Sequence, residues 1–225
     1  MNFVFEERPS NSPFVKAIWR TESAGTGTFI STAETHWEMV VTKYQGKTTF
    51  TMRGPETTAR PAPVPPNAEF LGIVFTFGTF MPHLPGDKLV NEEVNLPEAN
   101  SQRVWLHGSA WEIPDFENVD TFVAKLAREG LLIREPVVEA VLKNRPLAMS
   151  LRTVQRRFLR ATGLTCGAFA QIERARQAAT FLEQGFSIAD AVYQAGYADQ
   201  PHLTRSLKRF MGQTPAQIIR INESR

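Results

Sequence analysis

The sequence has few of the features that mark secreted, membrane-spanning or metal-binding proteins. Its one cysteine, Cys166, cannot form a disulfide within the chain and excludes a cysteine-rich zinc site. No apolar run approaches the ~18 residues that a membrane span needs, and the first residues lack the basic start and apolar core of a signal peptide. Hydrophobic residues make up 42% and charged residues 21% of the 225 residues, as in ordinary globular proteins. We therefore expect a cytoplasmic protein that does not bind membranes.

The sequence also has few arrangements that could carry out chemistry. A cupin-type metal site needs a His-x-His pair, but the segment with His36 and Glu38 supplies only one histidine. The next histidines, His83 and His107, are distant in the sequence. There is no Gly-x-x-x-x-Gly-Lys phosphate loop, and "HGS" at 107–109 is not a nucleophile elbow. We expect no catalytic residue, no metal and no cofactor, and hence not an enzyme.

Charge is distributed unevenly along the chain, although the net charge is only +2. From Val137 to Arg225 there are 13 Lys and Arg against 6 Asp and Glu, a net of +7, whereas the preceding residues carry a net of −5. A basic part joined to an acidic part indicates that only the C-terminal part meets a polyanion. Many solvent-exposed helical faces are basic, however. The excess of positive charge therefore indicates a polyanion site only if the basic residues also lie on one suitable surface.

About the first 115 residues have the composition of β-strands. "FVKAIWRTE", "GTFISTAE", "HWEMVVTKYQGKTTFTMRG" and "EFLGIVFTF" are rich in valine, isoleucine, threonine and aromatic residues. Turn signals separate them at Gly25-Thr26-Gly27, Gln45-Gly46 and Arg53-Gly54-Pro55. This spacing predicts a small sandwich or barrel. The proline-rich stretch "RPAPVPPN" could be a polyproline ligand, but a stiff extended loop joining two strands is favoured, because central strands exclude proline.

Four aromatic residues of this β-rich part could line an apolar ligand pocket. They are Trp37, Phe50, Phe75 and Phe77. Aromatic residues on strands more commonly form the core, so the sequence identifies no ligand.

From Asp120 onward, apolar residues recur at helical spacing, which predicts an all-α part. Within it, residues 150–169 and 199–218 form an internal repeat with an offset of 49 positions. Helix caps, buried positions, arginines and closing glycines coincide. The aligned pairs are Ser150 and Asp199, Val154 and Leu203, Arg156 and Arg205, Phe158 and Leu207, Arg160 and Arg209, Gly163 and Gly212, and Thr165 and Thr214.

Each copy follows a shorter apolar helix, predicted at Pro136–Asn144 and Ile188–Ala195. A helix, a tight turn and a capped basic helix make a helix-turn-helix unit. A linker helix predicted over Gly167–Glu183 would span ~25 Å. It is stiff enough to hold two recognition helices one duplex turn apart, about 34 Å.

Burying Val154 and Phe158 leaves an outer face of polar residues on the first recognition helix, and the second copy has a matching face. The base-contacting candidates are Arg152, Gln155, Arg156, Gln200, His202, Thr204 and Arg205. Arg and Gln make paired hydrogen bonds to guanine and adenine edges in the major groove. The phosphate-contacting candidates are Arg157, Arg160, Lys208 and Arg209. A solvated bundle face would explain one such helix; two in matched register favour DNA binding.

The stretch "SIADAVYQAGYADQPHLTRSLKRFMGQTP" closely resembles the second helix-turn-helix of the AraC/XylS family of bacterial transcription regulators, and "SLRTVQRRFLRATG" resembles the first. The similarity covers about residues 131–220. The N-terminal part more weakly resembles the family's cupin-like sensor domains. This resemblance implies control of transcription through sequence-specific binding to promoter double-stranded DNA, with a small-molecule effector, RNA polymerase and a second copy of the chain as further partners.

Three positions depart from the family pattern. Pro146 and Ala148 lie in the first turn where a glycine is usual, and Cys166 replaces a proline. We read Cys166 as a small packed side chain at a helix start rather than a redox sensor. Pro201 fits only the first turn of a helix and therefore predicts a helix that begins at Asp199 or Gln200.

These observations predict an α+β multidomain chain with three parts. They are a β-rich sensor or oligomerisation domain at 1–118, a connecting helix at 119–136 and a double helix-turn-helix domain at 137–225. Two alternatives stay open: a cupin-type metal-dependent enzyme with a helical appendage, and a non-specific nucleic-acid-binding scaffold.

Overall fold

The computed structural model describes residues 3–223, which fall into two compact units. The first unit comprises the described residues up to Gly27, His36–Pro55 and Pro63–Thr165. The second comprises Thr28–Thr35, Glu56–Ala62 and the described residues from Cys166 onward. Residues 1–2 and 224–225, at the ends of the predicted first and last domains, lie outside the described residues.

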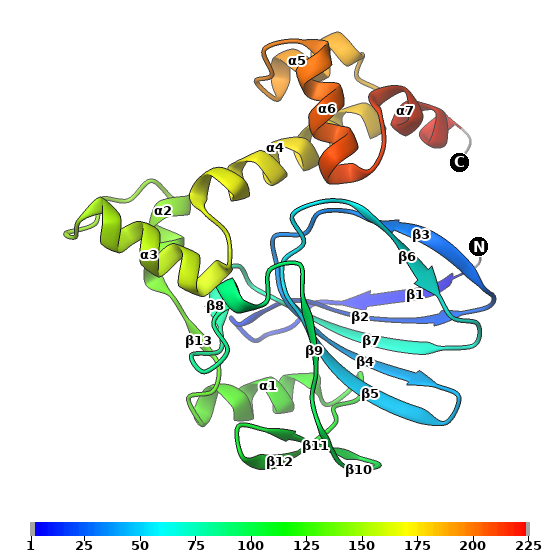
Figure 1. The fold of residues 1–225 in the computed structure, drawn as a ribbon, viewed down its shortest axis with the longest axis vertical. Coiled ribbons are helices and arrows are strands. Elements are labelled where there is room, and N and C mark those ends of the chain that lie inside the picture. Colours follow the sequence, from blue (N-terminus) through cyan, green and yellow to red (C-terminus); the bar gives the residue numbers. More distant parts are fainter. Residues whose placement is uncertain (1–2, 224–225) are drawn as a thin grey trace. The chain divides into compact units, whose positions relative to one another are not determined.

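The first unit is built on a six-stranded antiparallel sheet with strand order β1-β2-β7-β4-β5-β9 (Figure 1). Its strands are β1 (Phe3–Arg8), β2 (Val15–Ser23), β4 (Glu38–Tyr44), β5 (Lys47–Arg53), β7 (Glu69–Phe75) and β9 (Glu93–Asn95). The smaller sheets of this unit consist of β10 (Glu98–Asn100), β11 (Arg103–Leu106) and β12 (Ser109–Glu112), and of β8 (Thr79–Phe80) with β13 (Ile133–Arg134). The predicted turn at Gln45-Gly46 joins β4 to β5, with both residues at positive φ, as a tight hairpin requires.

Strand register places the core on one face of this sheet. Ile18 pairs with Ile73, Ile73 with Met39, and Met39 with Met52, and all four side chains are fully buried. Because side chains alternate along a strand, these residues point to the same side. Helix α1 (Val119–Arg128) contributes to the same core, with the Phe122 ring centroid 5.8 Å from that of Phe50. Burial of these apolar side chains is the main stabilising contribution to the first unit.

Three further helices belong to the first unit. They are the short 3-10 helix η1 (Gly86–Lys88), α2 (Pro136–Leu142) and α3 (Leu151–Thr162). Within the predicted connecting segment 119–136, the helix is α1, which ends before Gly130 at φ +70°. Strand β13 follows and pairs with β8. Glycine at this position fits the left-handed conformation that commonly ends a helix.

The second unit contains α4 (Cys166–Glu183), α5 (Ile188–Gln194), α6 (Gln200–Met211) and α7 (Pro215–Glu223). It also contains most of a two-stranded sheet formed by β3 (Gly27–Ser31) and β6 (Arg60–Val64). The proline-rich segment predicted as an extended loop is extended, but its first five residues form β6. Proline is tolerated there because each strand of a two-stranded sheet is an edge strand.

Residues that follow β3 and precede β6 pack against the helices of the second unit. We call the segments 28–35 and 56–62 together the β3–β6 ribbon. The backbone N–H groups of Ala33 and Ala59 donate to the carbonyls of Phe210 and Arg209, at 2.7 and 2.8 Å. These bonds satisfy carbonyls at the C-terminal end of α6 that have no partner within the helix. The ribbon therefore completes the end of this helix.

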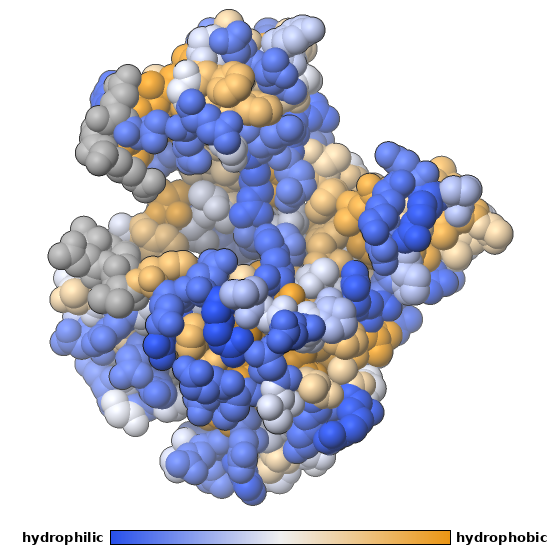
Figure 2. Space-filling view, turned by 180° about the vertical axis from the view of Figure 1, so that it is seen from behind, coloured by the Kyte–Doolittle hydropathy of each residue, from blue (hydrophilic) through white to orange (hydrophobic). Residues whose placement is uncertain are grey.

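The predicted order is confirmed: a β-rich part is followed by a helical part with two helix-turn-helix units and a long helix between them (Figure 1). Among residues 3–223, no helix is long and apolar enough to cross a membrane. Figure 2 shows that hydrophilic residues cover much of the visible face, with smaller apolar patches between them.

Candidate nucleic-acid interface

The two recognition helices, α3 and α6, begin and end in the same way. The Ser150 side chain accepts a hydrogen bond from the Thr153 N–H, and the Asp199 carboxylate accepts one from the His202 N–H. At the other end, Gly163 and Gly212 adopt φ values of +75° and +71°. The N-caps and closing glycines predicted from the repeat are thus confirmed.

The apolar positions of the repeat also match. Phe158 in α3 and Leu203 and Leu207 in α6 are fully buried, and Val154 is half-buried. The buried side of each helix is therefore the predicted one, and the polar residues lie on the opposite side.

On α3, the predicted base-reading residues Arg152, Gln155 and Arg156 are exposed, as is Arg160. Arg157 differs from them. Its guanidinium donates to both carboxylate oxygens of Glu135, at 2.7 and 3.1 Å, and the Glu135 side chain is only 10% exposed. This ion pair offsets the charge of Arg157, whereas Arg160 forms no ion pair with another described residue.

On α6, the predicted residues also reach the surface, except that Thr204 is half-buried. The exposed ones are Gln200, His202, Arg205, Lys208 and Arg209. Pro201 lies in the first turn of α6, as its missing N–H requires. Among the residues that the structure describes, Arg205, Lys208 and Arg209 form no ion pair within the protein. Their charges remain available to an outside anion.

The turns that precede the recognition helices differ. The connection between α2 and α3 runs over residues 143–150, whereas that between α5 and α6 runs over 195–199. Gly196 takes positive φ in the second turn, and Asn144 takes it in the first. Asparagine tolerates this conformation better than other residues with a side chain. The first turn thus has its left-handed residue before Pro146 and Ala148.

One basic residue beside α6 was absent from the prediction. Arg174 on α4 lies with its guanidinium 5.7 Å from the centre of the Tyr197 ring. In the sequence it is one of two arginines on the linker helix, with Arg176 two positions later. Spacing alone could not show that its side of α4 faces α6.

The four predicted aromatic ligand residues lie in the first unit. Trp37, Phe50 and Phe75 are buried, and the Trp37 and Phe75 rings stack at 4.0 Å. Phe77 is half-buried, with its ring 5.9 Å from His36 and 5.8 Å from Phe158. Their part in ligand binding remains a prediction.

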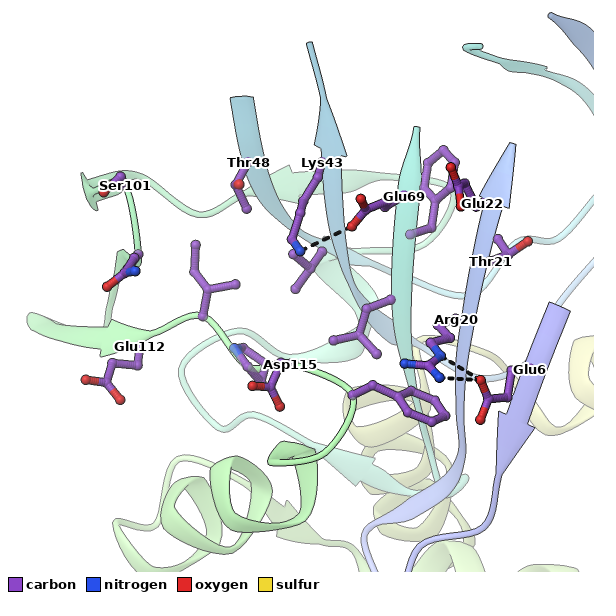
Figure 3. Close-up of a pocket in the computed structure, with 17 residues that line it drawn as sticks. Glu6, Arg20, Thr21, Glu22, Lys43, Thr48, Glu69, Ser101, Glu112 and Asp115 are labelled. Carbon is purple, nitrogen blue, oxygen red and sulfur yellow. Dashed lines mark hydrogen bonds and ion pairs between the residues drawn. The ribbon is translucent and has the colours of Figure 1, made fainter. Parts of the chain in front are cut away.

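A separate cavity of about 790 Å³ opens elsewhere in the first unit. Figure 3 shows charged side chains around it, with Arg20 turned toward Glu6 and Lys43 toward Glu69. Leu71 and Phe116 contribute apolar surface to its lining.

The histidines that are distant in sequence include one close pair. The His83 and His107 ring centroids are 4.4 Å apart. Burial, and next the charge of His107, lower the pKa of His83. Within the described part of the chain, no group of three or more His, Cys, Asp or Glu could hold a metal ion. Cys166 begins α4 half-buried, and burial raises the pKa of its thiol, which disfavours the reactive thiolate.

Comparison with known proteins agrees with this geometry. Residues 145–221 match a family model described as a helix-turn-helix domain. The HTH-type transcriptional regulator VirS of Mycobacterium tuberculosis is 37% identical over 106 residues, which are 47% of this chain and 30% of VirS. The HTH-type transcriptional regulator RipA of Corynebacterium glutamicum is 37% identical over 68 residues, 30% of this chain and 20% of RipA. The matches thus span less than a third of these relatives.

Among solved structures, ToxT from Vibrio cholerae O395 aligns with 96% of this chain and 97% of its own, at 11% identity and a TM-score of 0.43. The family match covers residues 145–221, which include both copies of the repeat. The predicted helix-turn-helix domain is therefore confirmed over residues 145–221, and the similarity to two HTH-type transcriptional regulators agrees with the AraC/XylS resemblance that the motifs indicate.

Proposed function

We propose that this protein regulates transcription by reading DNA with α3 and α6 in successive major grooves. The single observation that carries the proposal is the duplicated recognition helix. Each copy has a capped start, a buried apolar side and an exposed side bearing arginine and glutamine. This arrangement suits paired hydrogen bonds to base edges, each contributing about 1–3 kcal/mol of discrimination.

In this proposal the two helices divide their residues between bases and phosphates. Arg152, Gln155 and Arg156 on α3 read one half-site. Gln200, His202, Thr204 and Arg205 on α6 read the other. Arg160, Lys208 and Arg209, with a smaller part for Arg157, fix the register on the backbone. Phosphate contacts position the protein without carrying sequence information.

Selection of binding sites from randomised duplexes with the full-length protein tests the proposal. We expect two short motifs about 10 base pairs apart, bound with an affinity that falls steeply between 50 and 300 mM salt in fluorescence anisotropy. Strong binding without any recovered motif would favour the non-specific scaffold instead.

Arg205→Ala and Arg209→Ala separate base reading from phosphate contact. We expect Arg205→Ala to lose discrimination between the selected site and a mutated site. Arg209→Ala should weaken binding to both duplexes about equally and flatten the salt dependence. Equal, sequence-independent losses in the two variants would contradict these roles.

The β-rich part supplies the regulatory input in this proposal, through a small molecule or through self-association. The cavity of about 790 Å³ is the candidate effector site, because it combines apolar surface with charged side chains. A thermal-shift screen can test it with Ile113→Trp, which adds bulk to the cavity wall. A ligand of this cavity should stabilise the wild type and not the variant; equal stabilisation would place the ligand elsewhere.

The remaining partners follow from the same role. A regulator of this kind acts in the bacterial cytoplasm at promoters, where RNA polymerase is a partner, and it is not an enzyme. Light scattering with and without DNA tests whether two copies form a homodimer. The comparisons give no support to a metal-dependent enzyme.

A further inference from the structure

A small hollow lies between α4 and α6 in the second unit. Its volume is about 280 Å³, slightly below the range of pockets that hold drug-sized molecules. Arg174 lines it from α4, Tyr197 from the turn before α6, and His202, Arg205 and Arg209 from α6 itself. We call this hollow the α4–α6 notch.

The lining of the notch has one sign of charge. Three arginines contribute to it, and every other lining residue is neutral or a histidine. Among the residues that the structure describes, none of these three arginines forms an ion pair within the protein. Arginines that converge without a carboxylate create a positive potential that an anion relieves, and the planar guanidinium suits the oxygens of a phosphate.

Neighbouring groups hold the notch in shape. The Tyr197 hydroxyl and the Ser206 hydroxyl are hydrogen-bonded at 2.8 Å, and the His202 ring meets the Tyr197 ring edge-on at 5.0 Å. The Arg174 guanidinium lies over the same ring. Burial raises the pKa of the Tyr197 phenol, against the opposing effects of the Ser206 hydrogen bond and the Arg174 charge, so Tyr197 stays neutral. A neutral phenol adds no negative charge that would repel an anion.

We infer that the α4–α6 notch binds one phosphate of the DNA backbone, with Arg174 on the linker helix as a phosphate contact beside Arg209. This inference rests on the proposed function and adds α4 to the DNA-binding surface. Helix α4 then has a second role: it positions the second recognition helix on the duplex, and it also connects the two helix-turn-helix units. Arg205 lies at the border between the notch and the face that reads bases.

Variants of Arg174 in the full-length protein test the inference. We expect Arg174→Ala to weaken binding to the selected site and to an unrelated duplex by a common factor of about five at 100 mM salt. The slope of log affinity against log salt should become less steep by about 0.9. Arg174→Lys should keep most of the slope because it keeps the charge. Arg128→Ala, an exposed arginine on α1, is the control for the loss of one positive charge. Thermal melts establish that each variant is folded.

Duplexes with a single uncharged methylphosphonate locate the contact. The wild type should lose affinity when one particular phosphate of the second half-site is replaced, and Arg174→Ala should lose nothing further at that position. Additive losses at every position would overturn the inference. So would an Arg174→Ala variant that behaves like Arg128→Ala while the wild type binds its selected site normally. Failure of the wild type to bind any duplex would instead overturn the proposed function itself.

Inorganic phosphate tests whether the notch binds a free phosphate ion rather than a phosphate of the DNA backbone. At constant ionic strength, 10 mM phosphate should leave the melting temperature nearly unchanged and compete only weakly with DNA, because one free phosphate lacks the neighbouring backbone contacts. Strong stabilisation of the wild type by phosphate, abolished by Arg174→Ala and without an effect of that variant on DNA affinity, would mean that the notch serves a free anion. That result would overturn the DNA contact.

Discussion

The two recognition helices share a sequence pattern but have different surroundings. Helix α3 lies in the β-rich first unit, where Phe158 meets Phe77 and Gly163 lies against Gly86 in η1. Helix α6 lies in the second unit, where the β3–β6 ribbon completes its C-terminal end. The repeat therefore determines the local form of each helix, and residues distant in sequence determine what holds it.

The difference extends to the basic residues. Arg157 of α3 is paired with Glu135, whereas its counterpart in the repeat is the uncharged Ser206 of α6. In the second unit the main internal ion pair lies away from the recognition helix. Arg176 of α4 donates to both carboxylate oxygens of Glu34 at 2.7 Å. Among the described residues, one of the four arginines of α3 is thus paired, whereas none of the three Lys and Arg residues of α6 is.

The largest expected effect comes from the glycines that close the two helices. A Cβ at Gly163 would lie 2.6 Å from the Gly86 carbonyl oxygen, and one at Gly212 would lie 2.6 Å from the Cγ2 methyl of Ile30. Side chains move more easily than backbone. We expect Gly163→Ala to lower the free energy of unfolding by about 3 kcal/mol, from left-handed strain together with the backbone clash, and Gly212→Ala to cost less.

Gly130→Ala is the matched control, since Gly130 has φ +70° but nothing within 4 Å of an added Cβ. Gly130→Ala should lower the free energy of unfolding only by the cost of placing alanine in the left-handed conformation, about 1 kcal/mol. All four tryptophans, Trp19, Trp37, Trp105 and Trp111, lie in the first unit, so their fluorescence during urea unfolding reports that unit. Equal losses in Gly163→Ala and Gly130→Ala would contradict the backbone contact.

The next effect concerns the β3–β6 ribbon. Removing Arg176 takes two charge-assisted hydrogen bonds of 2.7 Å from the Glu34 carboxylate, so Arg176→Ala should destabilise the second unit by about 2 kcal/mol. Helical circular dichroism should show this loss, whereas tryptophan fluorescence should change little. Arg60→Ala removes one hydrogen bond from a more exposed arginine, and Glu56 keeps the one that Ser31 donates, so it should cost about 0–1 kcal/mol. If Arg176→Ala lowered the stability no more than Arg60→Ala, the Glu34–Arg176 ion pair would not be what holds the ribbon in place.

A smaller effect separates two arginines of α3. Arg160→Ala should make the salt dependence of DNA binding less steep by about one contact. Arg157→Ala should change it less, because Glu135 already offsets the charge of Arg157. Anisotropy titrations at several salt concentrations measure both slopes. A steeper change for Arg157→Ala would indicate that DNA displaces Glu135 from this arginine.

The smallest effect is a pH dependence confined to the first unit. The pKa of His83 is lowered from 6.5 by burial and by His107, so the folded protein disfavours protonated His83. Its contribution to stability is present in full above pH 6.5 and is lost as the pH falls below that value. In His83→Gln the melting temperature should therefore fall less between pH 7 and pH 5 than it does in the wild type. An unchanged pH profile would assign the acid sensitivity to other groups.

The predictable features of this molecule are local ones. Ser150, Asp199, Gly163 and Gly212 act within one helix each, so spacing alone identified the caps and the buried faces of α3 and α6. The same holds for the turn at Gln45-Gly46.

The features that the sequence left open depend on contacts between distant segments. Strands β3 and β6 pair with each other, and Glu34 forms an ion pair with Arg176 of α4. Both strands and Glu34 lie more than a hundred positions before the helices of the second unit. Arg174 likewise needs the packing of α4 against α6 before its place in the notch is visible. Long-range pairing of this kind leaves no periodic signal in the sequence.

We propose above that both recognition helices, α3 and α6, read one duplex together. Inserting five base pairs between the two selected motifs turns the second motif to the opposite side of the helix, half a turn away. Anisotropy on the original duplex, the expanded duplex and a duplex with one motif measures the consequence. We expect the expanded duplex to bind no better than the single motif. Undiminished affinity for the expanded duplex would contradict simultaneous reading by α3 and α6.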